Sequence, residues 1–320
     1  MATPLVSVKM ITYNHEPYIR QAIDCVLNQK TNFPFELVIG EDCSTDSTRE
    51  IVFDYAKRYP DIIRVITSEQ NVGMKQNSKR TSDACRGKYI AICEGDDYWQ
   101  RDDKLQMQVD YMERHPECGL IYSDYNRHYV KQNLIIPDYL HFAKRIPDKS
   151  PDIQDIIMNK VEIRTCTVLL KKELILKIIE SDPFLFQSEH FKMGDTQLWA
   201  EISLHSKIYY INESLATYRI LENSASQNKD ITKKLQFDIS CSEMFCYLCD
   251  KHKMPEYIKK PHEDNMRRYL LKLAFLESRI DSAEAVKKSF KNFSWKDWIW
   301  FYGTKSKLLN AIIKTVQIFR

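Results

Sequence analysis

Glycine is scarce in this chain, and the two common glycine-rich phosphate-binding motifs are absent. Only seven of the 320 residues are glycine. Neither G-x-G-x-x-G nor G-x-x-x-x-G-K-[ST] occurs, so the sequence contains no dinucleotide-binding fingerprint and no P-loop. Glycine used so sparingly is expected where the backbone needs unusual geometry or approaches a ligand closely. The positions of the few glycines are therefore informative.

Long hydrophobic runs and a strong charge of either sign are also missing. No apolar run approaches the roughly 18 residues that a membrane span needs, and residues 1–10 carry no charged-then-apolar leader. The net charge of +3 gives no argument for binding nucleic acid. With 43% hydrophobic and 28% charged residues, the chain is globular rather than disordered. We expect a cytoplasmic protein of one or two domains with no nucleic-acid partner.

The nine cysteines form no disulfide pattern. They are odd in number, scattered and mostly in apolar surroundings, which indicates reduced core residues of a cytosolic protein. Cys246, Cys249 and His252 leave a zinc site open as an alternative. No second pair of ligands follows at metal spacing, however, and intervals of three residues favour one face of a helix.

Apolar strands alternate with helical segments over the first hundred residues. The strands are expected at residues 6–12, 35–39, 62–66 and 89–93. One helix follows Pro17, a second opens with a capping box at Ser47–Glu50 and closes at Pro60, and a short third ends near Gly87. This alternation predicts an α/β fold, a doubly wound and mostly parallel sheet flanked by helices.

Polar clusters follow three of these strands. They are residues 13–16, Glu41-Asp42, and Glu94-Gly95-Asp96-Asp97. Ligands of doubly wound sheets bind outside the carboxyl ends of the strands, so we expect the three clusters to meet in one crevice. Four of the seven glycines also fall at the ends of these elements: Gly40, Gly73, Gly87 and Gly95.

The cluster Glu94-Gly95-Asp96-Asp97 places three acids in four residues. Their charges repel unless a cation lies between them, and a hard divalent cation with oxygen ligands, Mg²⁺ or Mn²⁺, fits that need. A solvated acidic turn that caps the next helix is the alternative. A bound cation would let carboxylates share a site with pyrophosphate, and Asp42 could accept from a base N–H or a ribose hydroxyl. The crevice therefore suits a nucleoside diphosphate.

Five motifs in this order resemble those of a family 2 glycosyltransferase. They are Val6-Ser7-Val8 with Thr12-Tyr13-Asn14, the run 41–48, Asn71-Val72-Gly73, the run 87–90, and the run 94–99. Their order and spacing match over roughly residues 5–225. The resemblance implies a GT-A fold and inverting transfer of a sugar from a nucleoside-diphosphate sugar, with uridine the commonest base.

The resemblance also implies residue roles. Asp97 and Asp96 would bind the metal, Asp96 would also touch the ribose, and Asp42 would contact the base. The residues that it assigns to the nucleotide or donor are Thr12, Tyr13, Asn14, Glu16, Asp42, Asn71, Gly73, Asp96 and Arg219. The family usually has aspartate as the first acid of the metal motif, where this chain has Glu94, so the contact of Glu94 stays open.

Asp195 is the expected catalytic residue. It follows Gly194 and precedes an apolar-periodic run, which also fits a plain helix N-cap. By the resemblance, an acid here is the general base that accepts the proton of the acceptor hydroxyl.

Related enzymes have a histidine that reaches the metal or phosphate where this chain has Leu221. Leucine cannot be a ligand, so either Arg219, Asn223 or Ser224 takes over part of that task, or the metal has fewer protein ligands. Arg219 suits a diphosphate by its charge and fork geometry. A surface salt bridge is the alternative for Arg219.

Beyond the first sheet strands, residues 126–162 are expected to be loop and short helix where an acceptor could dock, and residues 164–170 return to strand character. We expect a glycosyltransferase domain at residues 1–230 and a helical C-terminal region at 231–320. Residues 286–320 combine eight lysines or arginines with three tryptophans, which favours peripheral association with an anionic membrane surface, here the inner face of the cell membrane. A helix packed on the main domain with a solvated lysine face is the alternative.

The sequence thus predicts a metal-dependent hexosyltransferase of surface polysaccharide or lipid-linked glycan synthesis. Two alternatives stay open. A nucleotidyltransferase on a related sheet would need a glycine-rich N-terminal loop, and residues 6–16 contain no glycine. A degenerate sugar-nucleotide-binding protein is suggested by Glu94 and Leu221.

Overall fold

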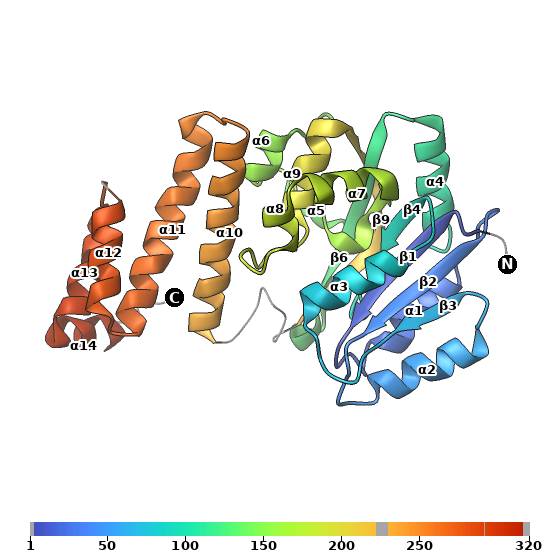
Figure 1. The fold of residues 1–320 in the computed structure, drawn as a ribbon, viewed down its shortest axis with the longest axis horizontal. Helices are drawn as coiled ribbons and strands as arrows, with labels where there is room; N and C mark the ends of the chain where they lie inside the picture. The colour runs from blue at the N-terminus through green and yellow to red at the C-terminus, as the bar shows by residue number, and fades with distance from the viewer. Residues whose placement is uncertain (1–2, 222–229, 291, 316–320) are drawn as a thin grey trace. The chain divides into compact units, whose positions relative to one another are not determined.

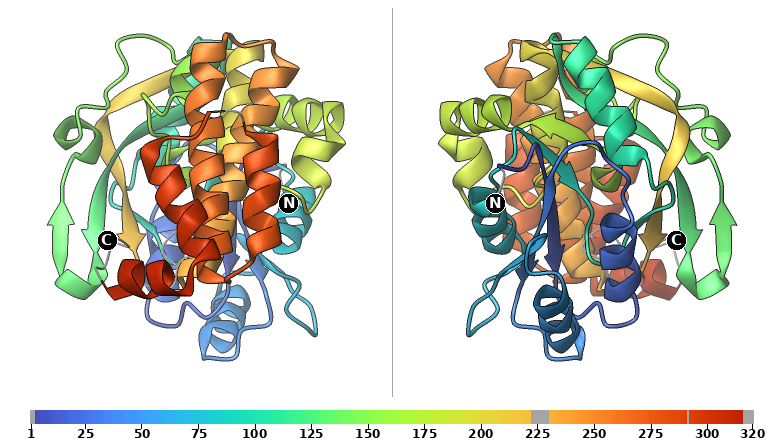
Figure 2. Two further views of the ribbon diagram at one scale, coloured as in Figure 1. Left: turned by 90° about the vertical axis from the view of Figure 1, so that its left-hand side faces the viewer. Right: turned by 90° about the vertical axis from the view of Figure 1, so that its right-hand side faces the viewer.

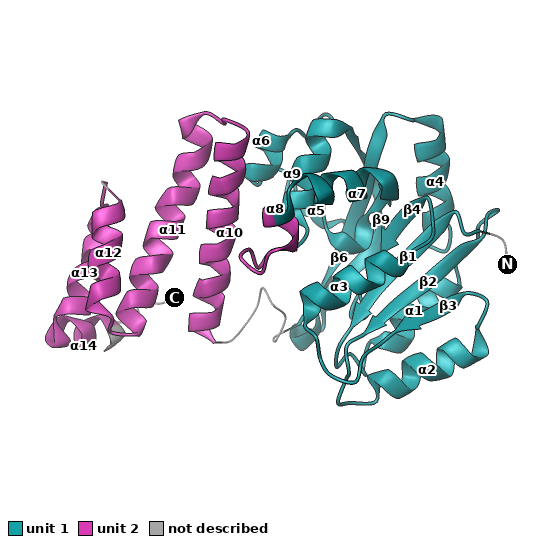
Figure 3. Ribbon diagram, in the orientation of Figure 1, with its two compact units in different colours: residues 1–183, 194–221 teal, residues 184–193, 222–320 magenta. Residues whose placement is uncertain are grey.

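The computed structural model describes residues 3–221, 230–290 and 292–315. These residues fall into two compact units (Figure 3). Unit 1 comprises residues 1–183 and 194–221, and unit 2 comprises residues 184–193 and 222–320. Residues 222–229 lie outside the described part of the chain, so the expected domain boundary after residue 230 stays a prediction.

Unit 1 is built on one mixed sheet (Figure 1). Its strands are β1 (Val6–Thr12), β2 (Phe35–Glu41), β3 (Ile63–Ile66), β4 (Tyr89–Ile92), β5 (Tyr98–Trp99), β6 (Cys118–Tyr129), β7 (Leu134–Ile136), β8 (Leu169–Lys171) and β9 (Lys207–Ile220). Their order is β3-β2-β1-β4-β8-β6-β9-β5, with β7 paired to β6. All pairings among strands β1 to β4 are parallel. The two long strands β6 and β9 also pair in parallel. The predicted α/β class with a mostly parallel sheet is confirmed.

Helices flank this sheet. They are α1 (Ile19–Leu27), α2 (Thr48–Arg58), α3 (Met74–Ala84), α4 (Lys104–Arg114), α5 (Tyr139–Phe142), α6 (Ile153–Ile157), α7 (Lys172–Ser181) and α9 (Thr196–His205), with the 3₁₀ turns η1 (Val130–Gln132) and η2 (Thr165–Thr167). Helices α1 and α3 lie on opposite faces of strands β1–β4 (Figure 2). Leu37, Val38 and Ile39, which are consecutive residues of β2, are fully buried. Such continuous burial is typical of parallel strands that are covered on both faces.

Two local predictions are wrong. Ser47 precedes α2 but makes no capping hydrogen bond with its side chain; Asp46 Oδ1 instead accepts from the backbone N–H of Thr48 at 2.9 Å. Residues 126–129, expected as loop, continue β6 because they pair with residues 217–220 of β9. That partner lies about ninety residues away in the chain, so the local polar pattern could not reveal it.

Unit 2 is helical. Its helices are α10 (Ile231–Lys251), α11 (Glu256–Leu276), α12 (Ile280–Ser289), α13 (Trp295–Lys305) and α14 (Lys307–Thr315), and most of α8 (Pro183–Gln187) also belongs to it. This confirms the expected helical C-terminal part. Cys246 and Cys249 are buried on α10, and none of the nine cysteines, all of which lie in the described residues, forms a disulfide bond. In the described ranges, no helix is long and apolar enough to cross a membrane.

The tryptophans of the C-terminal segment do not share one surface. Trp300 is 4% exposed and packs edge-on against Phe275 in the core of unit 2, with ring centroids 5.2 Å apart. Trp295 is 69% exposed. Trp300 therefore fills the helical core of unit 2, and the expected association of residues 286–320 with a membrane surface stays a prediction.

One lysine of unit 1 is fully buried. The Nζ of Lys104 donates to Gln108 Oε1 at 2.7 Å and lies 4.3 Å from the ring centroid of Trp99. Burial lowers the pKa of Lys104 to about 7, despite the opposing effect of nearby thiols. Because the unfolded chain has an ordinary lysine pKa, the unfolded state binds more protons between pH 7 and about 10. Stability should therefore rise with pH across this window.

Replacing Lys104 with methionine removes this cost. We expect the variant to gain up to about 4 kcal/mol in free energy of unfolding at pH 7, a gain that fades as the pH approaches 10. Urea unfolding at both pH values measures it. Lys79→Met, at an exposed lysine paired with Asp83, is the control and should change stability by less than about 1 kcal/mol. A Lys104→Met protein less stable than wild type at pH 7 would contradict the expectation.

Candidate active site

Thr12, at the end of β1, lies between two of the predicted clusters. Strand β1 pairs in parallel with β2 on one side and β4 on the other, so the carboxyl ends of the three strands are neighbours. Thr12 O accepts from Asp42 N at 3.1 Å, and Gly95 N donates to Ile11 O at 3.0 Å. A Cβ atom on Gly95 would lie 2.6 Å from Thr12 Oγ1, so this close approach requires glycine.

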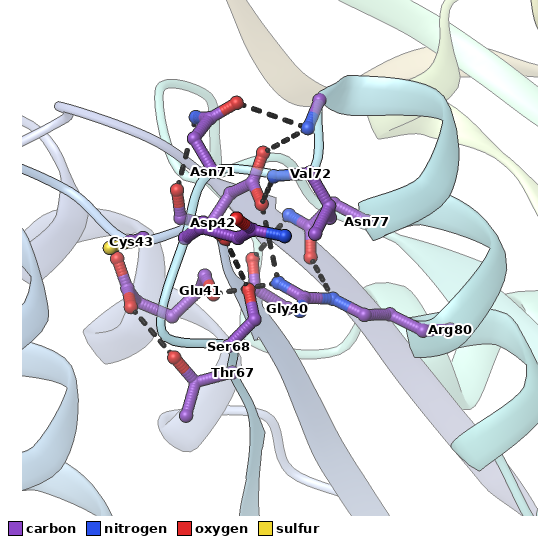
Figure 4. A network of polar contacts seen from close by, with 12 residues as sticks. Gly40, Glu41, Asp42, Cys43, Thr67, Ser68, Asn71, Val72, Asn77 and Arg80 are labelled. Carbon is purple, nitrogen blue, oxygen red and sulfur yellow. Dashed lines mark hydrogen bonds and ion pairs between the residues drawn. The ribbon is translucent and has the colours of Figure 1, made fainter.

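Asp42 contacts Asn71 and Val72 directly (Figure 4), and it also contacts Gly73. Its carboxylate, 2% exposed, accepts from Val72 N and Gly73 N, each at 2.9 Å, and Asn71 Nδ2 donates to Asp42 O at 3.1 Å. Arg80 adds an ion pair at 3.4 Å. Asp42 therefore holds the loop before α3. Oδ1 accepts from both Val72 N and Arg80, whereas the one donor to Oδ2 among the described residues is Gly73 N, so Oδ2 keeps a lone pair for a ligand.

Residues 13–16, which follow β1, form hydrogen bonds with the loop after β2. Asn14 Oδ1 accepts from Thr45 N at 2.8 Å, and Glu16 Oε2 accepts from Ser47 N at 3.3 Å. Tyr13 is 41% exposed. A surface cavity of about 630 Å³ is lined by Glu16, Pro17, Arg20, Ser47, Glu50, Ile51 and Asp54. Of the predicted donor residues only Glu16 lines it, so this cavity is not the predicted donor site.

The acids after β4 repel one another. Burial, followed by the charge of Asp96, raises the pKa of Glu94 to about 7, and Asp195 contributes to this rise. Burial, with the charges of Asp96 and Glu94, also raises the pKa of Asp97 well above its ordinary value. Glu94 Oε2 is buried and has no hydrogen-bond partner among the described residues. A cation here would relieve both the repulsion and the missing partner.

The donor set fits a hard divalent cation. Within residues 3–221, 230–290 and 292–315, no three histidine, cysteine, aspartate or glutamate side chains converge closely enough to enclose a metal ion. Mg²⁺ and similar cations are commonly bound by one or two carboxylates while substrate phosphates and water complete the shell. Asp97 and Asp96 are the predicted ligands, and they suit such an open site.

Arg219 is buried beside this loop. Its backbone N–H donates to Asp97 Oδ1 at 2.8 Å, and its guanidinium donates to Asp96 O at 2.6 Å and to Gln21. The rings of Tyr18 and Tyr98 flank the guanidinium. Arg219 is 6% exposed, so the alternative that it forms a surface salt bridge is wrong. Arg219 positions the acidic loop, while its predicted contact with the diphosphate stays a prediction.

Two further predictions concern the histidine replacement at Leu221 and the role of Asp195. Leu221 follows the end of β9, as the sequence requires, whereas Asn223 and Ser224 lie outside the described residues. Asp195 caps α9, since its Oδ1 accepts from Thr196 N at 2.6 Å. The capping interpretation of Asp195 is therefore confirmed. Its role as general base stays a prediction, and its charge reaches Glu94.

Sequence reasoning missed two residues at this site. His15 Nδ1 lies 3.2 Å from Thr12 Oγ1, and His15 Nε2 lies 3.9 Å from Asp96 Oδ2. Its place in the polar cluster after β1 was the available signal. Lys9 lies inside β1; burial lowers its pKa, and the charge of Glu94 opposes that shift. Nothing in the local pattern linked Lys9 to an acid 85 residues later.

Several relatives of known sequence are glycosyltransferases by name. An uncharacterized protein of Mycobacterium tuberculosis is 48% identical over 117 residues, which is 37% of this chain and 34% of that protein. This chain thus matches about a third of the length of that relative. A putative teichuronic acid biosynthesis glycosyltransferase of Bacillus subtilis, TuaG, is 30% identical over 71% of this chain and 83% of its own. An Escherichia coli UDP-Glc:alpha-D-GlcNAc-diphosphoundecaprenol beta-1,3-glucosyltransferase, WfgD, is 28% identical over 73% and 85%.

Solved structures share the fold. Staphylococcus aureus TarS (residues 1–349) in complex with UDP-GlcNAc matches with a TM-score of 0.55 and 16% identity over 93% of this chain and 79% of that chain. The mannosyltransferase PcManGT of Pyrobaculum calidifontis, in complex with GDP-Man and Mn²⁺, matches with a TM-score of 0.57 and 14% identity over 98% and 88%. Both likenesses support the GT-A fold. The family model "Glycosyl transferase family 2" matches residues 7–174, more than half of the chain, and the protein belongs to this family of glycosyltransferases.

Proposed function

We propose that this glycosyltransferase is metal-dependent and inverting, and that it moves a hexose from a UDP-sugar to a hydroxyl acceptor in surface polysaccharide or lipid-linked glycan synthesis. One observation carries the metal and diphosphate part of the proposal. Thr12 joins Asp42 on one side to the buried, mutually repelling acids on the other. A base-binding carboxylate and a cation-binding loop would then flank one nucleoside diphosphate.

In this mechanism Asp42 accepts from the base and Asp96 from the ribose. Asp97 and Asp96 would hold the cation, which would supply neutralisation of the charge on the departing diphosphate. Asp195 accepts the proton of the acceptor hydroxyl as that oxygen attacks the anomeric carbon. Attack on the face opposite to the leaving group inverts the anomeric configuration.

The finer assignments draw on relatives. WfgD is named for a UDP-sugar donor and a diphosphoundecaprenol-linked acceptor, and TuaG for teichuronic acid biosynthesis. PcManGT was solved with GDP-Man and Mn²⁺, so guanosine is the competing base. On α14, Leu308 is 75% exposed and Ile312 is 49% exposed, and Lys307, which directly precedes Leu308, is exposed as well. Exposed apolar residues among lysines support a peripheral position at an anionic membrane surface.

Turnover of labelled donors tests the proposal. We expect wild-type protein with Mn²⁺ to release or transfer labelled sugar from a UDP-sugar faster than from GDP- or CDP-sugars, and EDTA to abolish the reaction. If the protein binds a nucleotide sugar but releases or transfers sugar from none of the UDP-, GDP- and CDP-sugars, it is a degenerate binding protein. Formation of a nucleotide sugar from UTP and a sugar 1-phosphate would instead indicate a nucleotidyltransferase.

A further inference from the structure

Three arginines of unit 1 surround a single glutamate. Glu162 is contacted by Arg164 Nε at 2.7 Å, by Arg145 Nη1 at 2.7 Å and by Arg127 Nη2 at 3.6 Å. Arg127 belongs to β6, while the other three residues lie between α5 and η2. We call Arg127, Arg145, Arg164 and Glu162 the arginine cluster. Its members lie within residues 126–164. None of them lies at the strand ends that precede Asp42 and Asp97.

The positive charges of the arginine cluster are not balanced. Burial alone would raise the pKa of Glu162, but Arg164, the Tyr125 hydroxyl and Arg127 outweigh burial and lower it, so Glu162 is ionised. Across the described ranges, Glu162 is the only carboxylate that pairs with any of the three arginines. One negative charge therefore faces three positive ones. Charges held in a partly buried site favour binding of a counterion.

Part of the hydrogen-bonding capacity of the cluster is also unused. Arg127 Nε is buried and has no hydrogen-bond partner among the described residues. The rest of the Arg127 guanidinium is fixed, because it donates to the Tyr139 hydroxyl and lies 4.0 Å from the centroid of that ring. The cluster thus presents preorganised donors. Arginine forks of this kind match the oxygens of phosphate groups.

The arginine cluster lies beside the acids of the candidate active site. Arg127 pairs with Tyr218 in the β6–β9 register, and the Arg164 guanidinium lies 4.7 Å from the centroid of the Tyr218 ring. Tyr218 directly precedes Arg219, whose N–H donates to Asp97. The charges of Asp97 and Asp96 also reach the Tyr218 hydroxyl. An anion bound by the cluster would therefore lie next to the expected site of transfer.

We propose that Arg127, Arg145 and Arg164 form a phosphate-binding subsite for the acceptor, so that the acceptor carries a phosphate close to the hydroxyl that is glycosylated. This assignment to the acceptor rests on the proposed function. The diphosphate of the donor is the other source of the same chemistry. The location favours the acceptor, because the cluster is built from the last residues of β6 and the segment between β6 and β8, and not from the ends of β1, β2 and β4.

Calorimetry with sn-glycerol 3-phosphate tests this subsite. We expect wild-type protein saturated with UDP and Mg²⁺ to bind one glycerol 3-phosphate, and Arg145→Gln to weaken that binding about tenfold or more, because a charge-assisted hydrogen bond is lost. Arg145 is the most exposed arginine of the cluster, so its replacement should leave the fold intact. Arg101→Gln, at an exposed arginine paired with Asp103 and Glu213, is the matched control and should bind like wild type.

Every other outcome of this calorimetry also shows whether the arginine cluster binds the phosphate of the acceptor. If the wild-type complex does not bind glycerol 3-phosphate, or Arg145→Gln binds it equally well, the arginine cluster is only structural and the proposal is wrong. If glycerol 3-phosphate displaces UDP, or Arg145→Gln loses affinity for UDP, the cluster serves the donor instead. If wild-type protein does not bind UDP at all, the proposed function fails. In that case glycerol 3-phosphate is titrated into the protein without UDP. Binding to wild type that Arg145→Gln lacks supports the phosphate site, and absence of binding to wild type overturns it.

Discussion

Replacing Asp97 with asparagine should reduce sugar transfer about a thousandfold or more, because a bound cation supplies several kcal/mol of transition-state stabilisation and each 1.4 kcal/mol is worth tenfold. Asparagine keeps the size of the side chain and an oxygen that can still accept from Arg219 N, now 2.8 Å from Asp97 Oδ1. The loss should therefore come from the missing charge. Turnover measured against Mn²⁺ concentration should show a much higher metal requirement.

The stability of the metal-free protein separates this effect from misfolding. Burial and the neighbouring acids raise the pKa of Asp97, so ionised Asp97 costs folding free energy at neutral pH. The metal-free Asp97→Asn protein should therefore be at least as stable as metal-free wild type. Asp102→Asn, at a half-exposed acid five residues away that pairs with Lys30, is the control and should keep full activity. Normal turnover in Asp97→Asn would show that Asp97 is not a metal ligand.

Replacing Asp195 with asparagine should lower the turnover number about 10²- to 10⁴-fold, the range for loss of a general base. Asparagine caps helices as well as aspartate does, so α9 should remain folded and the affinity for UDP with Mn²⁺ should change little. Steady-state kinetics together with UDP calorimetry measures both quantities. A loss confined to turnover is what distinguishes a base from a structural cap.

Asp230 provides the matched control for Asp195. It caps α10 with the same kind of contact, accepting from Thr232 N at 2.9 Å, and it belongs to unit 2. Asp230→Asn should keep normal turnover. If Asp195→Asn and Asp230→Asn behave alike, Asp195 is a helix cap and nothing more.

The first strands of the sheet could be predicted from sequence because their burial is local information. Strands β1, β2 and β4 are apolar runs between polar breaks, and parallel pairing buries both of their faces. The carboxyl ends of parallel neighbours share one edge, so Asp42 and the acidic loop could be placed on either side of Thr12. The far half of β6 could not be predicted, because its pairing depends on a strand distant in the chain.

Contacts between distant polar side chains explain what else was missed. The predicted partner of Arg219 was a diphosphate, yet its guanidinium donates to Asp96 O and Gln21, which no spacing rule connects to it. The three arginines on Glu162 lie in a segment expected to be irregular, where charge alone indicates solvent exposure. The burial of Trp300 could not be predicted for a similar reason, since an aromatic residue among lysines fits a membrane surface and a helical core equally well.

Calorimetry of UDP binding to the wild-type protein, with and without Mn²⁺, tests the central claim most directly. If the acids beside Asp42 hold a cation together with the leaving phosphates, UDP should bind at least about tenfold more tightly with Mn²⁺, and Mn²⁺ should bind more tightly by the same factor with UDP. Equal UDP affinity in the presence and absence of Mn²⁺ would contradict the account.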